Sequence, residues 1–276
     1  MNRMKVWFIW TWFIWGNMSQ NFIERGFDVI KYNNKELIGN KDKLSECNIV
    51  FLAVPTPTIN WKFDSSILDD AVKATSAGQK VIIKSTVIVW TTEKLQEKYQ
   101  DRYFFHSAEF LTEKNAKYDG DYPSRNIVWY TKESKQFATE ILSILPKSDN
   151  NVICKAAESE MWKYMSNFLL TAKVIMSNII YDICNHNDIN YNEVKNIAAI
   201  DKRIWDSHMN IEDDGWRWAN WHCFPKDLAV VTEMYPDWFS GQYLLDFMEE
   251  YNIDLCYKSG KQMDIINKVY WLSNTL

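Results

Sequence analysis

The stretch Lys5–Tyr32, KVWFIWTWFIWGNMSQNFIERGFDVIKY, decides the fold of the rest of the chain. Residues 5–9 form a short apolar run, which is typical of a buried strand. Residues 17–25 follow a helical pattern that ends at Gly26, and residues 28–32 form a second strand. A strand, a turn, a helix and a strand within about thirty residues predict the opening unit of a nucleotide-binding parallel sheet.

The turn of this unit is unusual. A G-x-G-x-x-G spacing would place glycine at the first, third and sixth positions of the turn, but the chain has Trp10-Thr11-Trp12-Phe13-Ile14-Trp15. Those glycines allow a tight turn, close approach of a pyrophosphate to backbone N–H groups, and close packing of helix on strand. Three indoles fill the space that a cofactor needs, so the turn alone favours an aromatic core strand.

Composition bounds the class of protein. The 276 residues are 47% hydrophobic and 24% charged, with a net charge of -5, which predicts a globular protein without a basic nucleic-acid-binding face. No apolar run approaches the ~20 residues of a membrane span, and residues 6–15 lack the cleavage site of a signal peptide. Five dispersed cysteines predict reduced thiols in the cytoplasm and no metal site.

Further strands are predicted at 48–54, 80–84, 103–107 and 126–130. Further helices are predicted at 65–77, from 91, and at 132–145, 156–185, 188–198, 227–234, 241–251 and 261–273. The predicted fold class is α/β: a Rossmann-like doubly wound parallel sheet over residues 1–155, then a long central helix and a smaller helical domain over residues 156–276.

The stretch Trp216–Asp227, WRWANWHCFPKD, carries the clearest chemistry. Cys223 stands beside Lys226, a cation that favours the thiolate, and Asp227 follows directly. A small apolar cysteine in a loop is the alternative for such a residue.

The motif HCFPKD resembles the signature of the UDP-glucose/GDP-mannose dehydrogenase family, and other motifs of that family follow the same order over nearly the whole chain. They are Lys84-Ser85-Thr86, Glu109-Phe110-Leu111-Thr112-Glu113, Tyr122-Pro123-Ser124-Arg125, Glu158-x-Glu160-x-x-Lys163-x-x-x-Asn167 and Asp201-x-Arg203-Ile204. Each motif is modest, but the ordered set is specific.

The resemblance implies an NAD-dependent, two-step, four-electron oxidation of the C6 alcohol of a nucleotide sugar, UDP-glucose above others. Asp227, with a water held by Thr86, would take the alcohol proton, and Cys223 would attack the aldehyde to give a thioester. Glu113 would assist hydrolysis, and Lys163 and Asn167 would stabilise oxyanions.

The same resemblance assigns the binding residues. The cofactor would contact Trp10, Thr11, Trp12, Phe13, Ile14, Asn33, Pro55, Thr86 and Glu113. The substrate would contact Glu109, Phe110, Leu111, Lys163, Asn167, Arg203, Trp218, Trp221 and Lys226. Asn33 replaces the acidic residue that would bind the adenosine ribose. A homodimer through the central helix is implied, and no nucleic acid, membrane or metal partner is expected.

Tryptophan stands at many glycine positions of the family. They are Trp10, Trp12, Trp15, Trp90, Trp129, Trp205, Trp218 and Trp221, in a chain with eight glycines and fourteen tryptophans. The chain also stops before the family's further nucleotide-binding domain. We therefore expect the architecture to be encoded and the activity to be impaired. Two alternatives are a catalytically silent nucleotide-sugar-binding dimer scaffold and a β-hydroxyacid-type dehydrogenase without a nucleophilic cysteine.

Overall fold

The structure is a computed structural model that describes residues 4–9, 13–32, 43–108, 115–211, 217–219, 223–235, 240–260 and 263–270. The chain forms two compact units, and each is described by itself. The first comprises Met1–Thr56 and Ser65–Lys163, and the second comprises Pro57–Asp64 and Tyr164–Leu276.

The first unit is built on one seven-stranded sheet in the order β2-β1-β3-β6-β7-β8-β9. Its strands are β1 (Lys5–Ile9), β2 (Asp28–Tyr32), β3 (Ile49–Leu52), β6 (Lys80–Ile83), β7 (Tyr103–His106), β8 (Asn126–Tyr130) and β9 (Asn151–Lys155). All neighbouring strands pair in parallel except β7 and β8, which are antiparallel. This arrangement confirms the predicted Rossmann-like sheet. The antiparallel pair and the seventh strand, β9, were not predicted.

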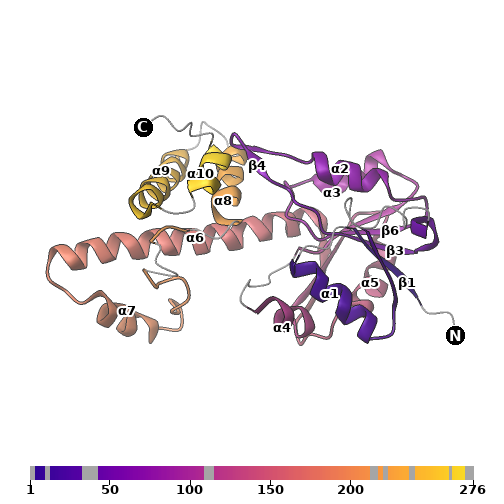
Figure 1. The fold of residues 1–276 in the computed structure, drawn as a ribbon, viewed down its shortest axis with the longest axis horizontal. Helices are drawn as coiled ribbons and strands as arrows, with labels where there is room; N and C mark the ends of the chain where they lie inside the picture. The colour runs from indigo at the N-terminus through magenta and orange to yellow at the C-terminus, as the bar shows by residue number, and fades with distance from the viewer. Residues whose placement is uncertain are drawn as a thin grey trace. The chain divides into compact units, whose positions relative to one another are not determined.

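Helices cover both faces of this sheet (Figure 1). Helices α2 (Ser66–Lys73) and α3 (Thr91–Lys98) lie on one face, and α1 (Phe13–Glu24) and α5 (Ala138–Ile144) lie on the other. The short helices α4 (Ala116–Asp121) and η3 (Lys135–Phe137) complete the unit. Strands between two helical layers are buried on both faces, which explains why β3 is apolar at every position.

Aromatic side chains form the centre of the core between the sheet and α1. Phe8 of β1 stacks on Phe51 of β3 with ring centroids 4.9 Å apart, and Phe22 of α1 meets both rings edge-on at 5.4 Å. All three side chains are fully buried. Such offset and edge-on pairs are the favoured arrangements of aromatic rings. The helix that follows the first strand is therefore fixed against the sheet by residues of the opening stretch.

Helix α6 (Ala156–His186) begins directly after β9 and continues into the second unit, as the uninterrupted helical pattern predicts. By length and composition alone this helix could cross a membrane. Within the second unit, however, Ile175 packs against Leu228, Leu245 and Met248. That packing is also what the core helix of a globular unit shows.

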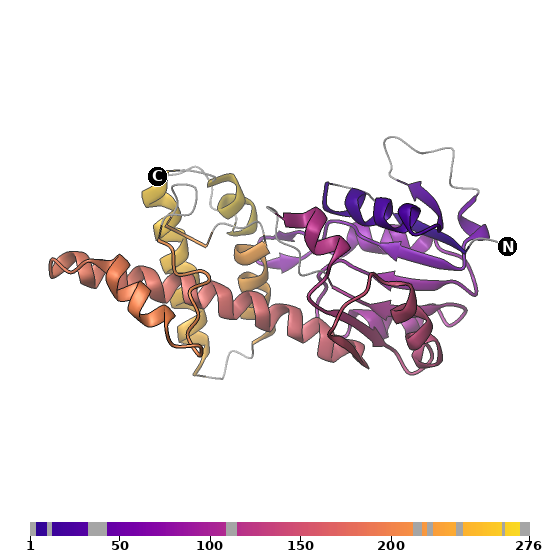
Figure 2. The same cartoon turned by 90° about the horizontal axis from the view of Figure 1, so that it is seen from below.

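The second unit adds four helices and a hairpin. The helices are α7 (Tyr191–Ala199), α8 (Cys223–Met234), α9 (Gln242–Ser259) and α10 (Met263–Tyr270), and the hairpin pairs β4 (Thr58–Ile59) with β5 (Lys62–Phe63). Helices α8, α9 and α10 pack on one another (Figures 1 and 2). Gly260 follows the last residue of α9 and caps the helix, and its φ of 67° is the left-handed conformation that suits a helix C-terminus.

Glu249 of α9 is a buried acid in this unit. Burial raises its pKa to about 7, although the neighbouring side chains of Thr232, Tyr270 and Trp61 act in the opposite direction. A carboxyl group whose pKa is raised in the folded state stabilises the fold most when protonated. Stability is therefore expected to fall as the pH rises from about 4.5 to about 7, by about 3 kcal/mol at most from this group.

We expect Glu249→Gln to flatten this dependence. Gln keeps the shape and the hydrogen-bonding capacity of protonated Glu249 but cannot ionise. Thermal melts at pH 5 and pH 8 should show a smaller difference for the variant than for the parent chain, with the gain in melting temperature confined to pH 8. Parallel pH profiles of the two proteins would contradict this prediction.

Candidate active site

Helix α8 presents the predicted nucleophile. Cys223 is its first residue and is exposed, and Pro225 lies in the first turn, where a missing N–H costs nothing. The sequence predicted a loop here and a helix from Asp227, so the helix begins one turn earlier than expected. The free N–H groups and partial positive charge of a helix N-terminus favour a thiolate.

A buried ion pair lies one turn further along α8. The Asp227 carboxylate is 1% exposed, and its Oδ1 accepts a hydrogen bond from Lys226 Nζ at 2.5 Å. Its Oδ2 accepts a hydrogen bond from Asn167 Nδ2 of α6, also at 2.5 Å. The second unit therefore brings together Asp227, Lys226 and Asn167, three residues that the sequence motifs singled out, at the start of the helix that carries Cys223.

The charge of Lys226 is maintained despite its burial. Burial by itself lowers the pKa of the ammonium group, but attraction to Asp227 and to Cys223, with the hydrogen bond to Asp227, raises the pKa above its ordinary value. Lys226 is therefore positively charged at neutral pH. The interaction with Cys223 is reciprocal, so the same cation favours the thiolate form of the cysteine.

Two distant segments brace the first turn of α8. The Thr58 hydroxyl of β4 donates to the Lys226 carbonyl at 3.2 Å, and the Tyr270 hydroxyl of α10 donates to the Pro225 carbonyl at 3.2 Å. Carbonyls held in this way fix the orientation of the turn. Sequence reasoning missed both residues, because no local pattern connects positions 58 and 270 with this turn.

In the first unit, the carboxyl ends of β6 and β7 carry a buried polar cluster. His106 Nε2 donates to the Ser85 carbonyl at 3.1 Å, which leaves Nδ1 to accept from the Ser159 hydroxyl. Burial, with a smaller contribution from the nearby charges of Lys84 and Lys163, lowers the pKa of His106 to about 3. The imidazole is therefore neutral. Polar residues directly after the apolar runs of β6 and β7 were the available signal for this cluster.

Pro55 and Thr86 follow the carboxyl ends of the neighbouring strands β3 and β6. The two ends are tied together, because Ser85 Oγ accepts from Val54 N at 2.9 Å and donates to the Val54 carbonyl at 2.7 Å. Thr56 Oγ1 donates to the Thr86 carbonyl at 2.6 Å. The segments that carry the predicted cofactor residues Pro55 and Thr86 are thus neighbours at one edge of the sheet.

The first turns of α6 hold the remaining helical motif residues. Lys163 is half-buried and lies one turn before Asn167. Glu160 is fully buried and accepts from Trp90 N at 2.6 Å and from Thr92 N at 2.9 Å, at the N-terminus of α3. Burial raises the pKa of Glu160 to about 7 despite these hydrogen bonds. Glu160 belongs to a family motif, but the sequence analysis gave it no role. In the structure its carboxylate caps the N-terminus of α3.

Arg203 lies in an exposed turn after α7. Its guanidinium pairs with Asp201, with Nη2 2.5 Å from Oδ2. Lys173 of α6 fixes the end of the turn by donating to the carbonyls of Ile204 at 2.7 Å and Trp205 at 2.5 Å. The Arg203 side chain is 89% exposed and so accessible to a ligand.

Other predicted site residues are placed as follows. Trp218 is buried in a core with Ala229, Leu255 and Tyr270, so its indole does not face solvent. Phe13 and Ile14 begin α1. Trp10, Thr11, Trp12, Asn33, Glu109, Phe110, Leu111, Glu113 and Trp221 lie outside the described residues.

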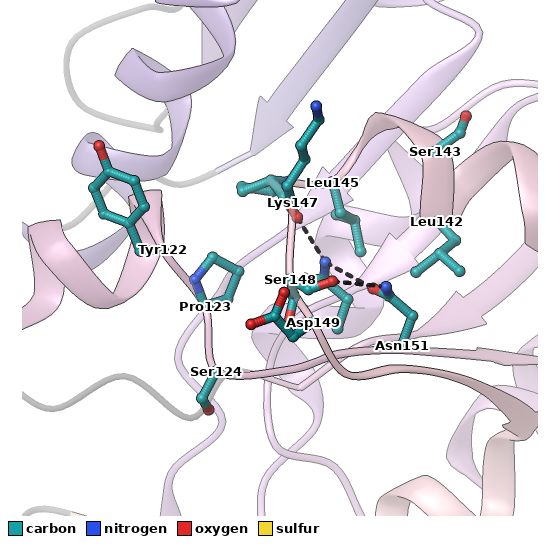
Figure 3. Close-up of a pocket in the computed structure, with 12 residues that line it drawn as sticks. Tyr122, Pro123, Ser124, Leu142, Ser143, Leu145, Lys147, Ser148, Asp149 and Asn151 are labelled. Carbon is teal, nitrogen blue, oxygen red and sulfur yellow. Dashed lines mark hydrogen bonds between the residues drawn. The ribbon is translucent and has the colours of Figure 1, made fainter.

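A pocket of about 700 Å³ in the first unit includes three residues of the YPSR motif (Figure 3). Tyr122 and Pro123 lie on one side of it, and Leu142 and Ser143 lie on the other. Two of its amides already hold the surrounding loop, because Asn126 Nδ2 donates to the Pro146 carbonyl and Asn151 Nδ2 donates to the Ser148 carbonyl. We assign no ligand to this pocket.

Comparisons with known proteins agree with the motif set. Residues 19–145 match the NAD-binding domain of the UDP-glucose/GDP-mannose dehydrogenase family, and residues 157–253 match the central domain of that family. Together the two matches span well over half of the chain.

Individual relatives are more distant. The chain is 28% identical over 204 residues to a putative UDP-glucose 6-dehydrogenase, YtcA, of Bacillus subtilis. The aligned region covers 69% of this chain and 47% of the relative. It is also 28% identical over 206 residues to a UDP-glucose 6-dehydrogenase of Streptococcus pneumoniae. That aligned region covers 69% of this chain and 51% of the relative. The matched region thus spans about half the length of these curated relatives.

A solved structure shows the same fold. The UDP-D-ManNAc dehydrogenase of Pyrococcus horikoshii aligns with a TM-score of 0.80 at 19% identity, over 95% of this chain and 71% of that one.

Proposed function

Because the chain belongs to the UDP-glucose/GDP-mannose dehydrogenase family, we propose that it is built to oxidise the C6 alcohol of a nucleotide sugar, UDP-glucose first among the candidates, to a carboxylate. The observation that supports this proposal most directly is the group Asn167, Lys226 and Asp227 at the start of the helix that presents Cys223.

NAD is the cofactor of the first unit, whose matched region is the NAD-binding domain of the family. The described residues fit it. The chain runs from β1 outward to β2 and then returns to β3 on the other side of β1, and open α/β sheets bind nucleotides where the strand order reverses in this way. The N-terminus of α1 follows β1 at this point and offers N–H groups to a pyrophosphate. When bound, NAD accepts a hydride in each of two oxidation steps.

The residues of the second unit would act in the following order. Asp227 accepts the proton of the C6 hydroxyl as the alcohol becomes an aldehyde, since each of its oxygens keeps a free lone pair beside its hydrogen bond. The Cys223 thiolate then forms an S–C bond to the aldehyde carbon, and loss of hydride converts the adduct to a thioester. Water breaks the S–C bond, which releases the carboxylate and restores the thiolate.

Asn167 and Lys226 would stabilise the negative charges that these steps involve. The Asn167 amide donates to Asp227 in the structure, and its second N–H is available for an oxyanion. Lys226 keeps Cys223 in its nucleophilic form. For Thr86, Glu113 and Lys163 we retain the water-holding, hydrolytic and oxyanion-binding roles that the resemblance implies, and Arg203 is proposed as a sugar contact.

Cys223→Ser provides the test of this reaction. In a chain with Trp10, Trp12 and Trp15 replaced by glycine, Cys223→Ser should lower NADH formation with UDP-glucose at least 100-fold at steady state, because the weaker nucleophile does not complete the second oxidation. The matched control is Cys256→Ser, which changes a buried cysteine of the same unit. Full activity of Cys223→Ser would instead support a β-hydroxyacid-type dehydrogenase. Binding of UDP-glucose without NADH formation by the chain with these three glycines would support the silent scaffold.

A cytoplasmic homodimer through α6 is part of the proposal. Within the second unit, α6 exposes an apolar stripe whose spacing of three, four and seven residues places it on one helix face: Met165, Leu169, Met176, Ile180 and Ile183. A contiguous exposed apolar face marks an interaction surface.

We expect Leu169→Lys/Ile180→Lys to shift the sedimentation coefficient from dimer to monomer at micromolar concentration. The control is Ile197→Lys, which places the same charge at an exposed apolar position on α7. An unchanged sedimentation coefficient for the double variant would exclude this stripe as the interface.

A further inference from the structure

Three tryptophans have a backbone conformation that bulky residues avoid. The φ angles of Trp61, Trp90 and Trp205 are 59°, 76° and 56°. The other described non-glycine residues with positive φ are Asn60, Asp188 and His208, which belong to the residue types that tolerate the left-handed region. Tryptophan has no side-chain chemistry that would favour this conformation, and its Cβ crowds the following carbonyl.

The hairpin β4–β5 identifies the residue type that its turn needs. Ile59 pairs with Lys62, so Asn60 and Trp61 form a two-residue loop in which both φ angles are positive. This is the type I′ turn, in which Asn-Gly is the preferred pair. The backbone of this turn therefore favours glycine at position 61, where the chain has tryptophan.

Hydrogen bonds hold the other two backbones in place. Trp90 N donates to the buried Glu160 carboxylate at 2.6 Å, and the Trp90 carbonyl accepts from Lys94 N at 3.1 Å as α3 begins. Trp205 N donates to the Asp201 carbonyl at 3.2 Å, and the Trp205 carbonyl accepts from Lys173. Neither residue can relax to a negative φ without losing these partners.

The indoles gain little burial in return. Trp61, Trp90 and Trp205 are 42%, 58% and 63% exposed. The whole chain has fourteen tryptophans and eight glycines, the reverse of the usual ranking of these residue types. Backbone conformation, exposure and composition thus all point to glycine at these positions.

We infer that positions 61, 90 and 205 are glycine in the polypeptide that the source organism makes, and that tryptophan arises there from the reading of one codon. UGG encodes tryptophan in the standard code, whereas UGA is a stop codon in that code, tryptophan in some other codes and glycine in others. If UGA codons that encode glycine are translated as tryptophan, one change of code places tryptophan at all three positions. The inference does not depend on the proposed function.

The direct test is the gene together with the native protein. We expect UGA at codons 61, 90 and 205, and mass spectrometry of peptides from protein purified from the source organism should find glycine at the three positions. UGG at these codons, or tryptophan in the native peptides, would overturn the inference.

A stability comparison tests the backbone argument on the recombinant chain. Glycine should give a melting temperature about 2–4 °C higher than alanine at position 90 and at position 205, because alanine cannot relieve the left-handed conformation. At position 162, which lies within helix α6, alanine should instead give a melting temperature about 2–4 °C higher than glycine. Position 61 is omitted because the Trp61 ring contacts Tyr270, with centroids 5.4 Å apart. Alanine variants that equal or exceed glycine at positions 90 and 205 would contradict the assignment.

Discussion

The triple variant Trp10→Gly/Trp12→Gly/Trp15→Gly should melt at a higher temperature in the presence of NAD, whereas the parent chain should show no such shift. In the structure β1 ends at Ile9 and α1 begins at Phe13, so only residues 10–12 connect them. A connection this short must let the pyrophosphate approach the backbone N–H groups at the helix start, and glycine permits that approach where an indole occupies the space.

The size of this effect follows from linkage between binding and folding. A ligand at a hundred times its Kd stabilises the fold by about 2.7 kcal/mol, which corresponds to a rise in melting temperature of about 5–11 °C for a chain of this size. The measurement is a thermal melt with and without millimolar NAD. Adding Trp218→Gly and Trp221→Gly should then raise turnover of UDP-glucose, although Trp218 is buried and its loss leaves a cavity that lowers stability.

The matched control replaces the same three tryptophans by alanine. Alanine removes the indole but keeps a Cβ atom, so the shift with NAD should be smaller than in the glycine variant. A glycine variant that melts cooperatively and does not respond to NAD would show that the loop is not the obstacle to binding. A shift in the parent chain would show that the tryptophans are tolerated.

Asp227→Ala is expected to cause the largest loss of stability of any single substitution considered for the second unit. The substitution leaves Lys226, whose side chain is only 16% exposed, without its carboxylate, and it removes the acceptor of the Asn167 amide. Removing one partner of a buried ion pair costs about 3–5 kcal/mol, chiefly because the remaining charge stays buried. The melting temperature should fall by about 6–20 °C.

Two further variants separate the ion pair from the chemistry. Lys226→Met/Asp227→Leu replaces both charges by apolar side chains of similar size and should recover most of the lost stability. Asp227→Asn keeps the shape and should stay folded. In the chain with glycine at positions 10, 12 and 15 it should abolish oxidation of UDP-glucose, because an amide cannot accept the alcohol proton. A melting temperature of Asp227→Ala within 2 °C of the parent would mean that the pair contributes little to the fold.

The fold could be predicted from the sequence where one local pattern defines an element. The apolar runs gave β1, β2 and β8 with their observed bounds, and the uninterrupted helical pattern gave α6 to within one residue. The hairpin β4–β5 was missed because each strand has two residues and its turn has tryptophan at the position where glycine would have been the signal. Strand β9 was missed because it is largely exposed and so lacks the pattern of a buried strand.

The contacts within the candidate site could not be predicted from the sequence. The motif order singled out Cys223, Asp227 and Asn167. No spacing in the sequence indicates that Asn167 Nδ2 lies 2.5 Å from Asp227 Oδ2. The hydrogen bonds that fix the first turn of α8 could not be predicted for the same reason, because Thr58 and Tyr270 are distant from this turn along the chain. Glu160 was visible as part of a motif, but its role at the start of α3 depends on a tertiary contact.

The hairpin Pro57–Asp64 has a consequence for the synthesis of the chain. It belongs to the second unit although residues of the first unit lie on both sides of it in the sequence. During translation the hairpin leaves the ribosome about two hundred residues before Val269, whose carbonyl accepts from Trp61 N at 3.0 Å, and before Tyr270, whose ring Trp61 contacts. A nascent chain of residues 1–163 would therefore carry a hairpin that has no partner, and a fragment that starts at residue 164 would lack the brace from Thr58 to the turn after Cys223. The contacts of the hairpin within the second unit can form only once α10 has been made.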